Sequence, residues 1–261
     1  MAIAVDDPYV RFCTAVRDLC GLNLLQYRRG QMERRIRTFA DRRGKNDLLS
    51  YLELLKTDEQ ELDDFLDRLT INVSQLWRNP EQWDVLGREI VPELAQAGKI
   101  NAWSAGCSYG AEAYTLAAVC HGNAPKARIS VVGWDIDRRM VHRARVGWFS
   151  DADARSAPRD ELARWFARAD GGWQADERLR ATCRFEVHDL LTETPSGPAF
   201  DLVLCRNTVI YFTEDVRDAL HARLAAHLRP GGFLLVGATE RVADAPGCGL
   251  VPVRPFVYRK A

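Results

Sequence analysis

The first part of the chain carries apolar residues at the spacing of one face of a helix. Glycines at positions 21, 30 and 44 interrupt this pattern, and two further amphipathic stretches start near Asp47 and Asp58. Apolar residues that recur every three or four positions predict helices with one buried face. We therefore expect residues 1–78 to form a small all-helical domain. The apolar positions that define its first two long helices are Phe12, Val16, Leu19, Met32, Ile36 and Phe39.

A connecting segment is expected at residues 79–97. Asn79 and Pro80 favour a helix start, because proline suits the first helical position. Trp83, Leu86 and Ile90 then continue an apolar face. This pattern predicts a connecting helix and linker.

After Gly98 the pattern changes to short apolar runs that alternate with helical stretches. Such alternation is typical of a parallel sheet flanked by helices. We expect residues 98–261 to form one α/β domain, with a small β insertion at about 170–187, where two glycines interrupt a polar stretch. The expected strands cover 99–105, 129–134, 184–187, 200–204 and 232–236, with a last one near 256–258, and the expected helices cover 111–121, 137–146, 159–168 and 214–228.

Composition narrows the class of protein. Of the 261 residues, 47% are hydrophobic and 28% are charged, as in a globular chain. No apolar run approaches the roughly 20 residues of a membrane span, and the start carries acids where a signal peptide carries basic residues. We therefore expect a cytoplasmic protein without membrane insertion. The seven cysteines form no CxxC pair, so no metal site or disulfide framework is expected, and Cys107 and Cys205 are interpreted as small, semi-buried residues.

Charge is balanced over the whole chain but not along it. The 36 basic residues equal the 36 acidic ones, which argues against a protein that holds nucleic acid over its whole surface. Residues 26–45 nevertheless carry eight basic residues against two acids, and residues 46–68 carry eight acids against two basic residues. The basic stretch is either a solvated helix face or a site for an acidic partner, with nucleic acid the least favoured interpretation. We expect Arg34 and Arg37 to point outward.

One segment has the pattern of a ligand loop. Ile100–Glu112 passes from an apolar strand through a glycine loop into a helix. Gly106 and Gly110 let the backbone approach a ligand closely, although an ordinary strand-to-helix turn has the same pattern. The next strand ends at Asp135, where nucleotide-binding folds place an acid for ribose hydroxyls, whereas Asp137 suits the cap of the following helix.

Further along, residues 230–232 form a Pro-Gly-Gly turn before an apolar strand, and the GxGxxG motif of dinucleotide oxidoreductases is absent from the sequence. A glycine loop, an acid-ended strand, a second strand and a Pro-Gly-Gly strand, in that order, resemble the class I methyltransferases that use S-adenosylmethionine. The resemblance implies a seven-stranded sheet with a reversed final strand.

Residues 205–212 read CRNTVIYF and resemble the CRNxxIYF signature of the CheR-type chemotaxis receptor methyltransferases. Residues 69–78 read LTINVSQLWR, which is similar to the LTxNxTxFFR of that family, and residues 189–191 match its DLL stretch. The similarity covers roughly residues 10–258. The chain departs from the family pattern at 110–115, where GAEAYT replaces GEEPYS, at Leu76 and Trp77, which replace two phenylalanines, and at 237–240, where GATE replaces GHSE.

This resemblance implies an enzyme that transfers the methyl group of S-adenosyl-L-methionine to glutamate side chains of a receptor and leaves S-adenosyl-L-homocysteine. Glu112 and Asp135 would hold the methionine amino group and the ribose, and Asp189 and Leu190 would lie beside the adenine. The cofactor set implied by the resemblance is Asn72, Ser74, Arg78, Gly106, Glu112, Asp135, Asp189, Leu190 and Asn207, and the acceptor set is Ser74, Arg78 and Tyr211.

Other interpretations remain open from the sequence. A non-catalytic module that binds S-adenosylmethionine or its product, and a small-molecule carboxyl methyltransferase, would share the cofactor half. Taken singly, Glu112 could be an acid at a helix start, Arg78 a solvated arginine and Tyr211 a half-buried core aromatic. The signature and the helical domain favour a protein acceptor. The expected partner of this chain, which we expect to act as a monomer, is the cytoplasmic domain of a methyl-accepting receptor or a similar acidic helical protein.

Overall fold

The computed structural model describes residues 7–69 and 74–261. The chain divides into two compact units. The helical unit comprises Met1–Ile71 and Tyr211–Val216, and the sheet unit comprises Asn72–Ile210 and Arg217–Ala261. A short stretch from late in the sequence, which contains Tyr211, thus belongs to the first unit.

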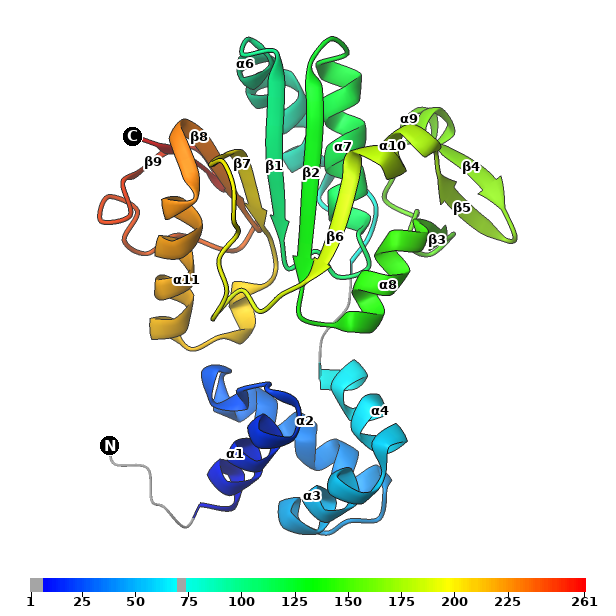
Figure 1. Cartoon of the computed structure of the whole chain (residues 1–261), viewed down its shortest axis with the longest axis vertical. Helices are drawn as coiled ribbons and strands as arrows, with labels where there is room; N and C mark the ends of the chain where they lie inside the picture. Colours follow the sequence, from blue (N-terminus) through cyan, green and yellow to red (C-terminus); the bar gives the residue numbers. More distant parts are fainter. Residues whose placement is uncertain (1–6, 70–73) are drawn as a thin grey trace. The chain divides into compact units, whose positions relative to one another are not determined.

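Between Asp7 and Leu69, the described residues of the helical unit form four α-helices and one 3₁₀ turn, as the apolar spacing predicts (Figure 1). They are α1 (Pro8–Cys20), the 3₁₀ turn Leu24–Gln26, α2 (Arg29–Arg42), α3 (Leu48–Thr57) and α4 (Glu59–Leu69). Side-chain caps fix two helix starts, because the carboxylates of Asp7 and Asp47 accept hydrogen bonds from backbone N–H groups of the first turn of α1 and α3. Gly21 ends α1 with a φ of 82°, a conformation that glycine adopts without strain.

Aromatic rings form the centre of this unit. The ring of Phe65 meets those of Phe12, Phe39 and Tyr51 edge-on, at centroid distances of 5.9, 6.3 and 5.7 Å. Met32, Ile36 and Phe39 are buried, as the sequence predicts for α2, whereas Leu19 is 40% exposed and does not join the core. Leu19 lies in the last turn of α1, and a single exposed leucine costs little.

The sheet unit contains a seven-stranded sheet with the order β6-β2-β1-β7-β8-β10-β9. The pairs of β1 with β2 and β7, of β2 with β6 and of β7 with β8 are parallel, whereas β10 is antiparallel to both of its neighbours. The class I methyltransferase sheet with a reversed final strand is therefore confirmed. Its strands are β1 (Lys99–Ala105), β2 (Arg128–Asp135), β6 (Cys183–Val187), β7 (Phe200–Cys205), β8 (Leu228–Val236), β9 (Leu250–Arg254) and β10 (Val257–Lys260).

The sequence did not predict β9, an edge strand whose residues other than Leu250 are mostly exposed. Pro252 within it has no N–H to donate, which is tolerated at an edge. The other six strands lie where the apolar runs predict them, with ends that differ by a few residues.

Helices precede or connect most of the strands (Figure 1). They are α5 (Pro80–Val85), a π-helical turn (Leu86–Ile90), α6 (Val91–Ala95), α7 (Ala111–Asn123), α8 (Arg138–Val146), α9 (Arg159–Trp165), α10 (Glu177–Thr182) and α11 (Glu214–Ala226), with a 3₁₀ turn at Val209–Tyr211. The strand order reverses between β1 and β7. In open α/β sheets the ligand crevice lies at this point, beyond the carboxyl ends of the strands.

A second, three-stranded antiparallel sheet has the order β3-β5-β4. Its strands are β3 (Trp148–Ser150), β4 (Phe166–Ala169) and β5 (Gly172–Ala175). The insertion expected at about 170–187 is thus a small β subdomain, but it begins earlier and ends at Ala175. Residues 183–187 belong to the main sheet instead, because β6 pairs in parallel with β2. The helix expected over 159–168 ends at Trp165, because Phe166–Ala169 forms β4 and pairs with β5.

No helix in the described parts of the chain is both long and apolar enough to span a membrane.

Candidate functional site

The loop between β1 and α7 has the backbone of a ligand loop. Gly106 has a φ of 81°, and a Cβ atom added there would lie 2.5 Å from Thr208 Oγ1. The N–H groups of Gly106 and Cys107 both donate to the Trp134 carbonyl, at 2.9 Å. Ser108 adopts a φ of 49° without being a glycine, and left-handed conformations of this kind collect at functional sites. The loop is therefore held tightly between β2 and the segment after β7.

Glu112 lies in the first turn of α7 and is 8% exposed. Its carboxylate accepts a hydrogen bond from Ser104 Oγ at 2.7 Å and pairs with Arg206 Nη1 at 3.3 Å. Burial raises the pKa of Glu112, while the Arg206 charge opposes that shift. The same burial lowers the pKa of Arg206. Such a carboxylate can accept an ammonium group without a competing shell of water.

Asp135 ends β2 and lies against the same loop. One carboxylate oxygen accepts from Ser108 N at 2.7 Å and the other accepts from Asp137 N at 3.0 Å. Burial raises the pKa of Asp135 to about 6, against the lowering effect of these backbone hydrogen bonds. Asp137 caps α8 through Arg139 N and Met140 N, as predicted. The predicted division between the two acids is thus confirmed for the cap, and the role of Asp135 toward a ligand stays a prediction.

Asp189 and Leu190 follow β6 beside Asp135. The preceding residue, His188, donates its N–H to the Asp135 carbonyl at 3.0 Å. The Asp189 carboxylate accepts from Leu191 N at 2.8 Å and from Thr192 Oγ1 at 3.1 Å, which fixes a tight turn. Leu190 is 7% exposed. An apolar side chain beside an acid-lined strand end suits one face of an adenine ring.

Asn207 stands beyond the end of β7 with a φ of 58°. Its N–H donates to Glu240 Oε2 at 2.8 Å, and Gly237 N donates to the same oxygen at 2.6 Å. Burial raises the pKa of Glu240. The carboxylate of Glu240 therefore joins the loop after β8 to the strained residue that follows Arg206.

Ser74 and Arg78 lie on a non-helical segment before α5. The Ser74 carbonyl contacts the Tyr109 hydroxyl. The Arg78 carbonyl accepts from Arg206 Nη2 at 2.7 Å and from Trp83 Nε1 at 2.9 Å. Both predicted residues are thus tied to the loop side of the sheet unit. Asn72, a third member of the predicted set, lies outside the described residues.

Tyr211 belongs to the helical unit rather than to the sheet unit. Its carbonyl accepts from Arg28 N at 2.9 Å, and Thr213 N donates to the Gln26 carbonyl at 3.0 Å. The neighbouring ring of Phe212 packs against Tyr27 at 5.0 Å. The last two residues of the CRNTVIYF stretch, Tyr211 and Phe212, therefore belong to the helical unit, while residues 205–210 belong to the sheet unit.

Three site residues were missed by sequence reasoning. They are Gln82, Arg206 and Glu240, all of them buried. Arg206 and Glu240 both fall inside motifs quoted above. The sequence signal for Arg206 is an arginine placed directly after a strand that is wholly buried. Gln82 lies on a helix and carries no comparable sequence signal.

The cysteines near the site are buried, as predicted. Burial raises the pKa of Cys107 and Cys205 well above the usual thiol value. A thiol held protonated is a poor nucleophile. No cluster of three metal-ligating side chains occurs in the described residues.

The carboxylates of the described residues fit an adenosyl cofactor whose amino acid end is charged. Glu112 offers a buried carboxylate for an ammonium, and Asp135 offers two oxygens whose remaining lone pairs suit ribose hydroxyls. Only glycine fits at position 106, because a Cβ atom there would collide with Thr208. All described members of the predicted cofactor set lie in the sheet unit.

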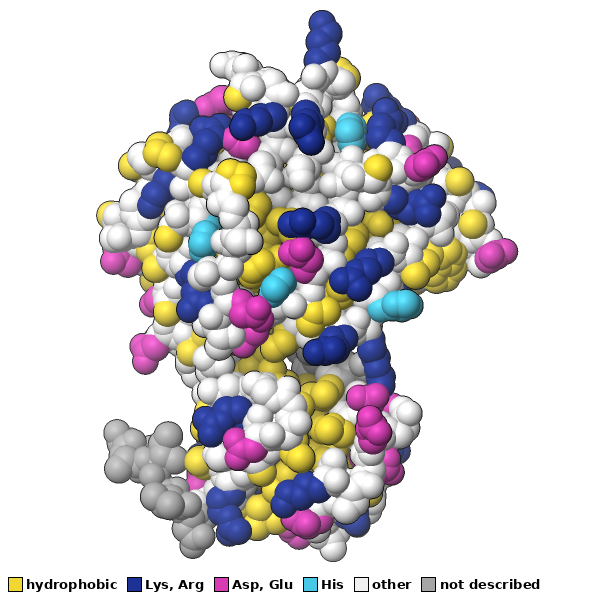
Figure 2. All heavy atoms as spheres, viewed as in Figure 1, with side chains coloured by type: hydrophobic (Ala, Val, Ile, Leu, Met, Phe, Trp, Pro, Cys, Tyr) yellow, Lys and Arg dark blue, Asp and Glu magenta, His cyan; other side chains and the backbone are white. Residues whose placement is uncertain are grey.

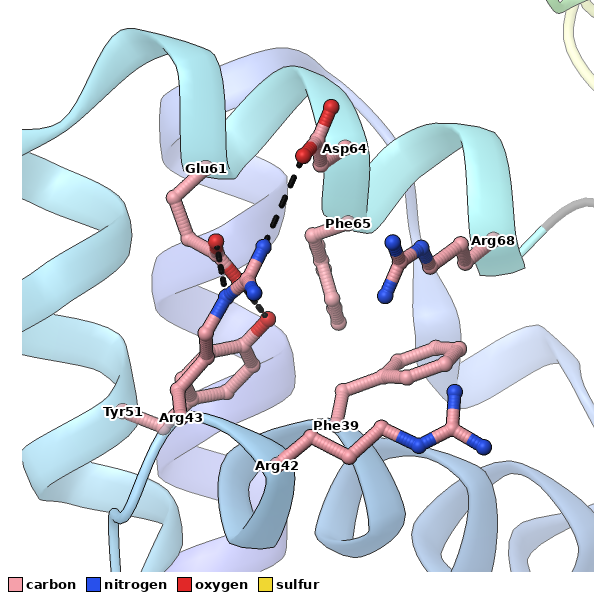
Figure 3. Close-up of a pocket in the computed structure, with 8 residues that line it drawn as sticks. All are labelled: Phe39, Arg42, Arg43, Tyr51, Glu61, Asp64, Phe65 and Arg68. Atoms are coloured by element: carbon pink, nitrogen blue, oxygen red, sulfur yellow. Dashed lines mark hydrogen bonds and ion pairs between the residues drawn. The ribbon is translucent and has the colours of Figure 1, made fainter.

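A separate pocket lies within the helical unit (Figure 3). It is lined by Phe39, Arg42, Arg43, Tyr51, Glu61, Asp64, Phe65 and Arg68. Arg43 pairs with Glu61 at 2.5 Å and with Asp64 at 3.5 Å, and the Tyr51 hydroxyl donates to Glu61 at 2.8 Å. These polar groups largely satisfy one another, so we interpret this pocket as a structural network of the helical unit.

The sheet order, the acid-ended strand and the glycine loop together define a class I methyltransferase that uses S-adenosyl-L-methionine. Comparison with known families specifies the class further. The family model of the CheR methyltransferase SAM-binding domain matches residues 72–248, and that of the CheR all-alpha domain matches residues 7–70. The chain therefore belongs to the CheR methyltransferase family, and it acts as an S-adenosylmethionine-dependent methyltransferase of chemotaxis.

Full-length relatives agree with this assignment. A chemotaxis protein methyltransferase of Listeria innocua is 32% identical over 258 residues, which cover 98% of each chain. Chemotaxis protein methyltransferase 1 of Pseudomonas aeruginosa is 27% identical over 255 residues, with 93% of each chain covered. Among solved structures, a SAM-bound amino pentose methyltransferase of Micromonospora echinaspora aligns with a TM-score of 0.35 and 22% identity, over 59% of this chain and 50% of that chain.

Proposed function

We propose that this enzyme transfers the methyl group to glutamate side chains of a receptor and so forms methyl esters. One observation carries the proposal. The Arg206 guanidinium contacts the buried carboxylate of Glu112 and the carbonyl of Arg78 at once. Arg78, the residue proposed to orient the acceptor, therefore lies on a segment that Arg206 connects to Glu112, the carboxylate proposed to bind the cofactor.

The chemistry requires little beyond positioning. A glutamate side chain exposed to water has a pKa of about 4.3, so near neutral pH it is already ionised and needs no general base. S-adenosylmethionine supplies an electrophilic methyl group on a sulfonium. Arg78 would hold the acceptor carboxylate in line with that methyl, and the burial of Glu112 indicates a site that excludes water at its inner end.

The helical unit offers a surface for an acidic partner. Arg34 and Arg37 are exposed on α2, as expected from their spacing. Arg37 pairs with Glu33 at 2.7 Å, and Arg29 pairs with Asp7 and Glu33, so part of the positive charge is already neutralised. On the face in view in Figure 2, Lys and Arg side chains are interspersed with Asp and Glu side chains. The mixed charge argues against general nucleic-acid binding, and the net excess on α2, five arginines against two acids, supports electrostatic steering of an acidic protein surface.

The test uses the whole chain with labelled S-adenosylmethionine and receptor-rich membranes. A glutamate methyl ester releases labelled methanol in base, whereas methylated amines retain the label. Membranes without methyl-accepting receptors serve as the control. Base-stable label on the receptor, or label found only in small molecules, would contradict the proposal. Tight cofactor binding without any transfer would favour a binding module instead.

A further inference from the structure

Arg206 is a highly connected side chain at the site. Its side chain is 2% exposed and lies over the ring of Trp83, 4.9 Å from the centroid. Nε donates to Gln82 Oε1 at 2.6 Å, and Nη2 donates to the Arg78 carbonyl at 2.7 Å. The contact of Nη1 with Glu112, at 3.3 Å, is longer. The guanidinium is therefore held more closely by the segment that carries Arg78 than by the carboxylate.

That segment needs external support. Trp77 and Asn79, on either side of Arg78, have φ values of 53° and 58°. Left-handed conformations cost non-glycine residues free energy and persist where surrounding contacts enforce them. Arg206 supplies such contacts on the Arg78 side, since Nη2 also lies 3.4 Å from Asn79 Oδ1.

A second, independent anchor holds the other end of the segment. The Tyr109 hydroxyl contacts the Ser74 carbonyl and lies 2.9 Å from Asp153 Oδ1. Leu76 N donates to the Asp153 carbonyl at 2.9 Å. The Ser74 and Leu76 contacts are made with Tyr109, in the loop before α7, and with Asp153. The Arg206 contacts reach Glu112 instead. The segment is also bonded to α7, because Trp77 N donates to Thr115 Oγ1 at 3.1 Å. Arg206 is nevertheless the side chain that contacts both the Glu112 carboxylate and the Arg78 carbonyl.

We propose that Arg206 is a positioning residue. It couples Glu112, the carboxylate proposed to bind the cofactor, to the position of Arg78. The inference rests on the role proposed for Arg78 above. Only arginine can make this set of contacts, because its planar fork donates in several fixed directions, whereas a lysine ammonium at the same place would keep the charge and lose the fork. A lysine at this position would keep a positive charge near Glu112, but a single ammonium could not donate to Gln82, the Arg78 carbonyl and Glu112 together.

The test is a double-mutant cycle of Arg206→Lys with Arg78→Ala, read out by kcat and by calorimetric cofactor affinity. Arg206→Lys should lower kcat about tenfold or more in the parent and change the cofactor Kd less than about threefold. In the Arg78→Ala background the same substitution should change kcat by less than about twofold, because a residue that acts through Arg78 has nothing left to place. Arg229→Lys is the matched control, since Arg229 pairs with the buried Asp201 at 2.5 Å, away from the residues assigned to the site.

Two results would overturn the inference alone. One is an equal loss of kcat in both backgrounds, and the other is a large rise in Kd with kcat unchanged, which would make Arg206 a cofactor-binding residue. Parental turnover of Arg78→Ala by itself would remove the proposed role of Arg78 and the inference together, so the two failures are distinguishable. If Arg206→Lys does not fold by circular dichroism, Gln82→Leu takes its place in the same cycle. It removes the Nε acceptor, leaves Arg206 in place and should give the same pattern with a smaller loss of kcat.

Discussion

The charged groups of the sheet unit and those of α2 differ in their access to water. The side chains of Glu112 and Arg206 are 9% and 2% exposed and have hydrogen-bonding partners inside the protein. The side chains of Arg29 and Arg37, by contrast, are 51% and 50% exposed, and their ion pairs face solvent. Water can replace a lost partner on α2, but it cannot do so at the strand ends.

This difference sets the size of the effects to expect. A buried charge that loses its partner keeps the full cost of desolvation, whereas an exposed ion pair contributes about 0–1 kcal/mol to stability. Substitutions at the site should therefore change catalysis or cofactor affinity strongly. Substitutions on α2 should act mainly on encounter with a partner, and should do so in a salt-dependent way.

The largest effect is expected for Arg78→Ala. Loss of the cation that orients the acceptor carboxylate should reduce kcat at least about a hundredfold, or roughly 2.7 kcal/mol of transition-state stabilisation. Calorimetry should show a far smaller change in cofactor affinity. Arg88→Ala, at an exposed arginine of the following helical segment, is the control and should keep parental turnover. Near-parental turnover of Arg78→Ala at saturating cofactor and receptor would identify Arg78 as an ordinary surface arginine.

Substitution of Asp135 should weaken cofactor binding more than it lowers kcat. Removing the carboxylate in Asp135→Ala takes away a charged acceptor for ribose hydroxyls and should weaken cofactor binding by about 1.5–3 kcal/mol. Excess cofactor should restore much of the turnover, because the loss falls on ground-state affinity. Titration calorimetry of the variant and the parent measures this directly. A large fall in kcat at saturating cofactor, with Kd unchanged, would contradict the assignment.

The pH dependence of binding sharpens the same prediction. Burial raises the pKa of Asp135 to about 6, so the free protein becomes protonated there as the pH falls through that value. The ionised acceptor is present above it, and affinity should therefore fall on acidification, by about tenfold between pH 7 and pH 5. Asp135→Asn, which cannot titrate, should bind more weakly and lose this dependence. A parent whose Kd is flat over that range would show that the Asp135 charge does not contribute.

Features set by neighbouring residues could be predicted from the sequence, whereas contacts between distant residues could not. Strand ends such as Ala105 and Asp135 follow from apolar runs that stop at a glycine or an acid, and the capping role of Asp137 follows from its place before a helix. The hydrogen bond between Gln82 and Arg206 joins residues 124 positions apart, and no local pattern encodes it. The early start of the small sheet was missed because β3 has only three residues, too few for a period-two pattern to emerge.

On α2 we expect a moderate effect. Reversing both exposed charges in Arg34→Glu/Arg37→Glu should raise the KM for receptor severalfold at low salt, because steering of an acidic partner is lost. Cofactor affinity should be unchanged, since Glu112 and Asp135 belong to the other unit. Initial rates at subsaturating receptor, measured at low and at high salt, check this.

The control for that charge reversal is Arg11→Glu/Arg17→Glu on α1, which makes the same change in net charge at two exposed positions of the same unit. If the control raises KM as much as the α2 variant does, the effect belongs to net charge and not to the α2 surface. Equal methylation by the α2 variant and the parent would exclude steering by α2 altogether.

The smallest effect is expected for Tyr211→Phe, which keeps the ring and removes only the hydroxyl. Tyr211 is half-buried in the helical unit, where the bond of its carbonyl to Arg28 N does not depend on the side chain. If the hydroxyl helps to hold the acceptor carboxylate, kcat should fall about three- to fivefold, the scale of one net hydrogen bond that water can partly replace. Tyr27→Phe, at the ring that packs against Phe212, removes a hydroxyl in the same unit and should leave kcat at the parental value. A loss of thermal stability with unchanged kcat in Tyr211→Phe would instead identify Tyr211 as a packing residue, and the acceptor carboxylate would then depend on Arg78 without it.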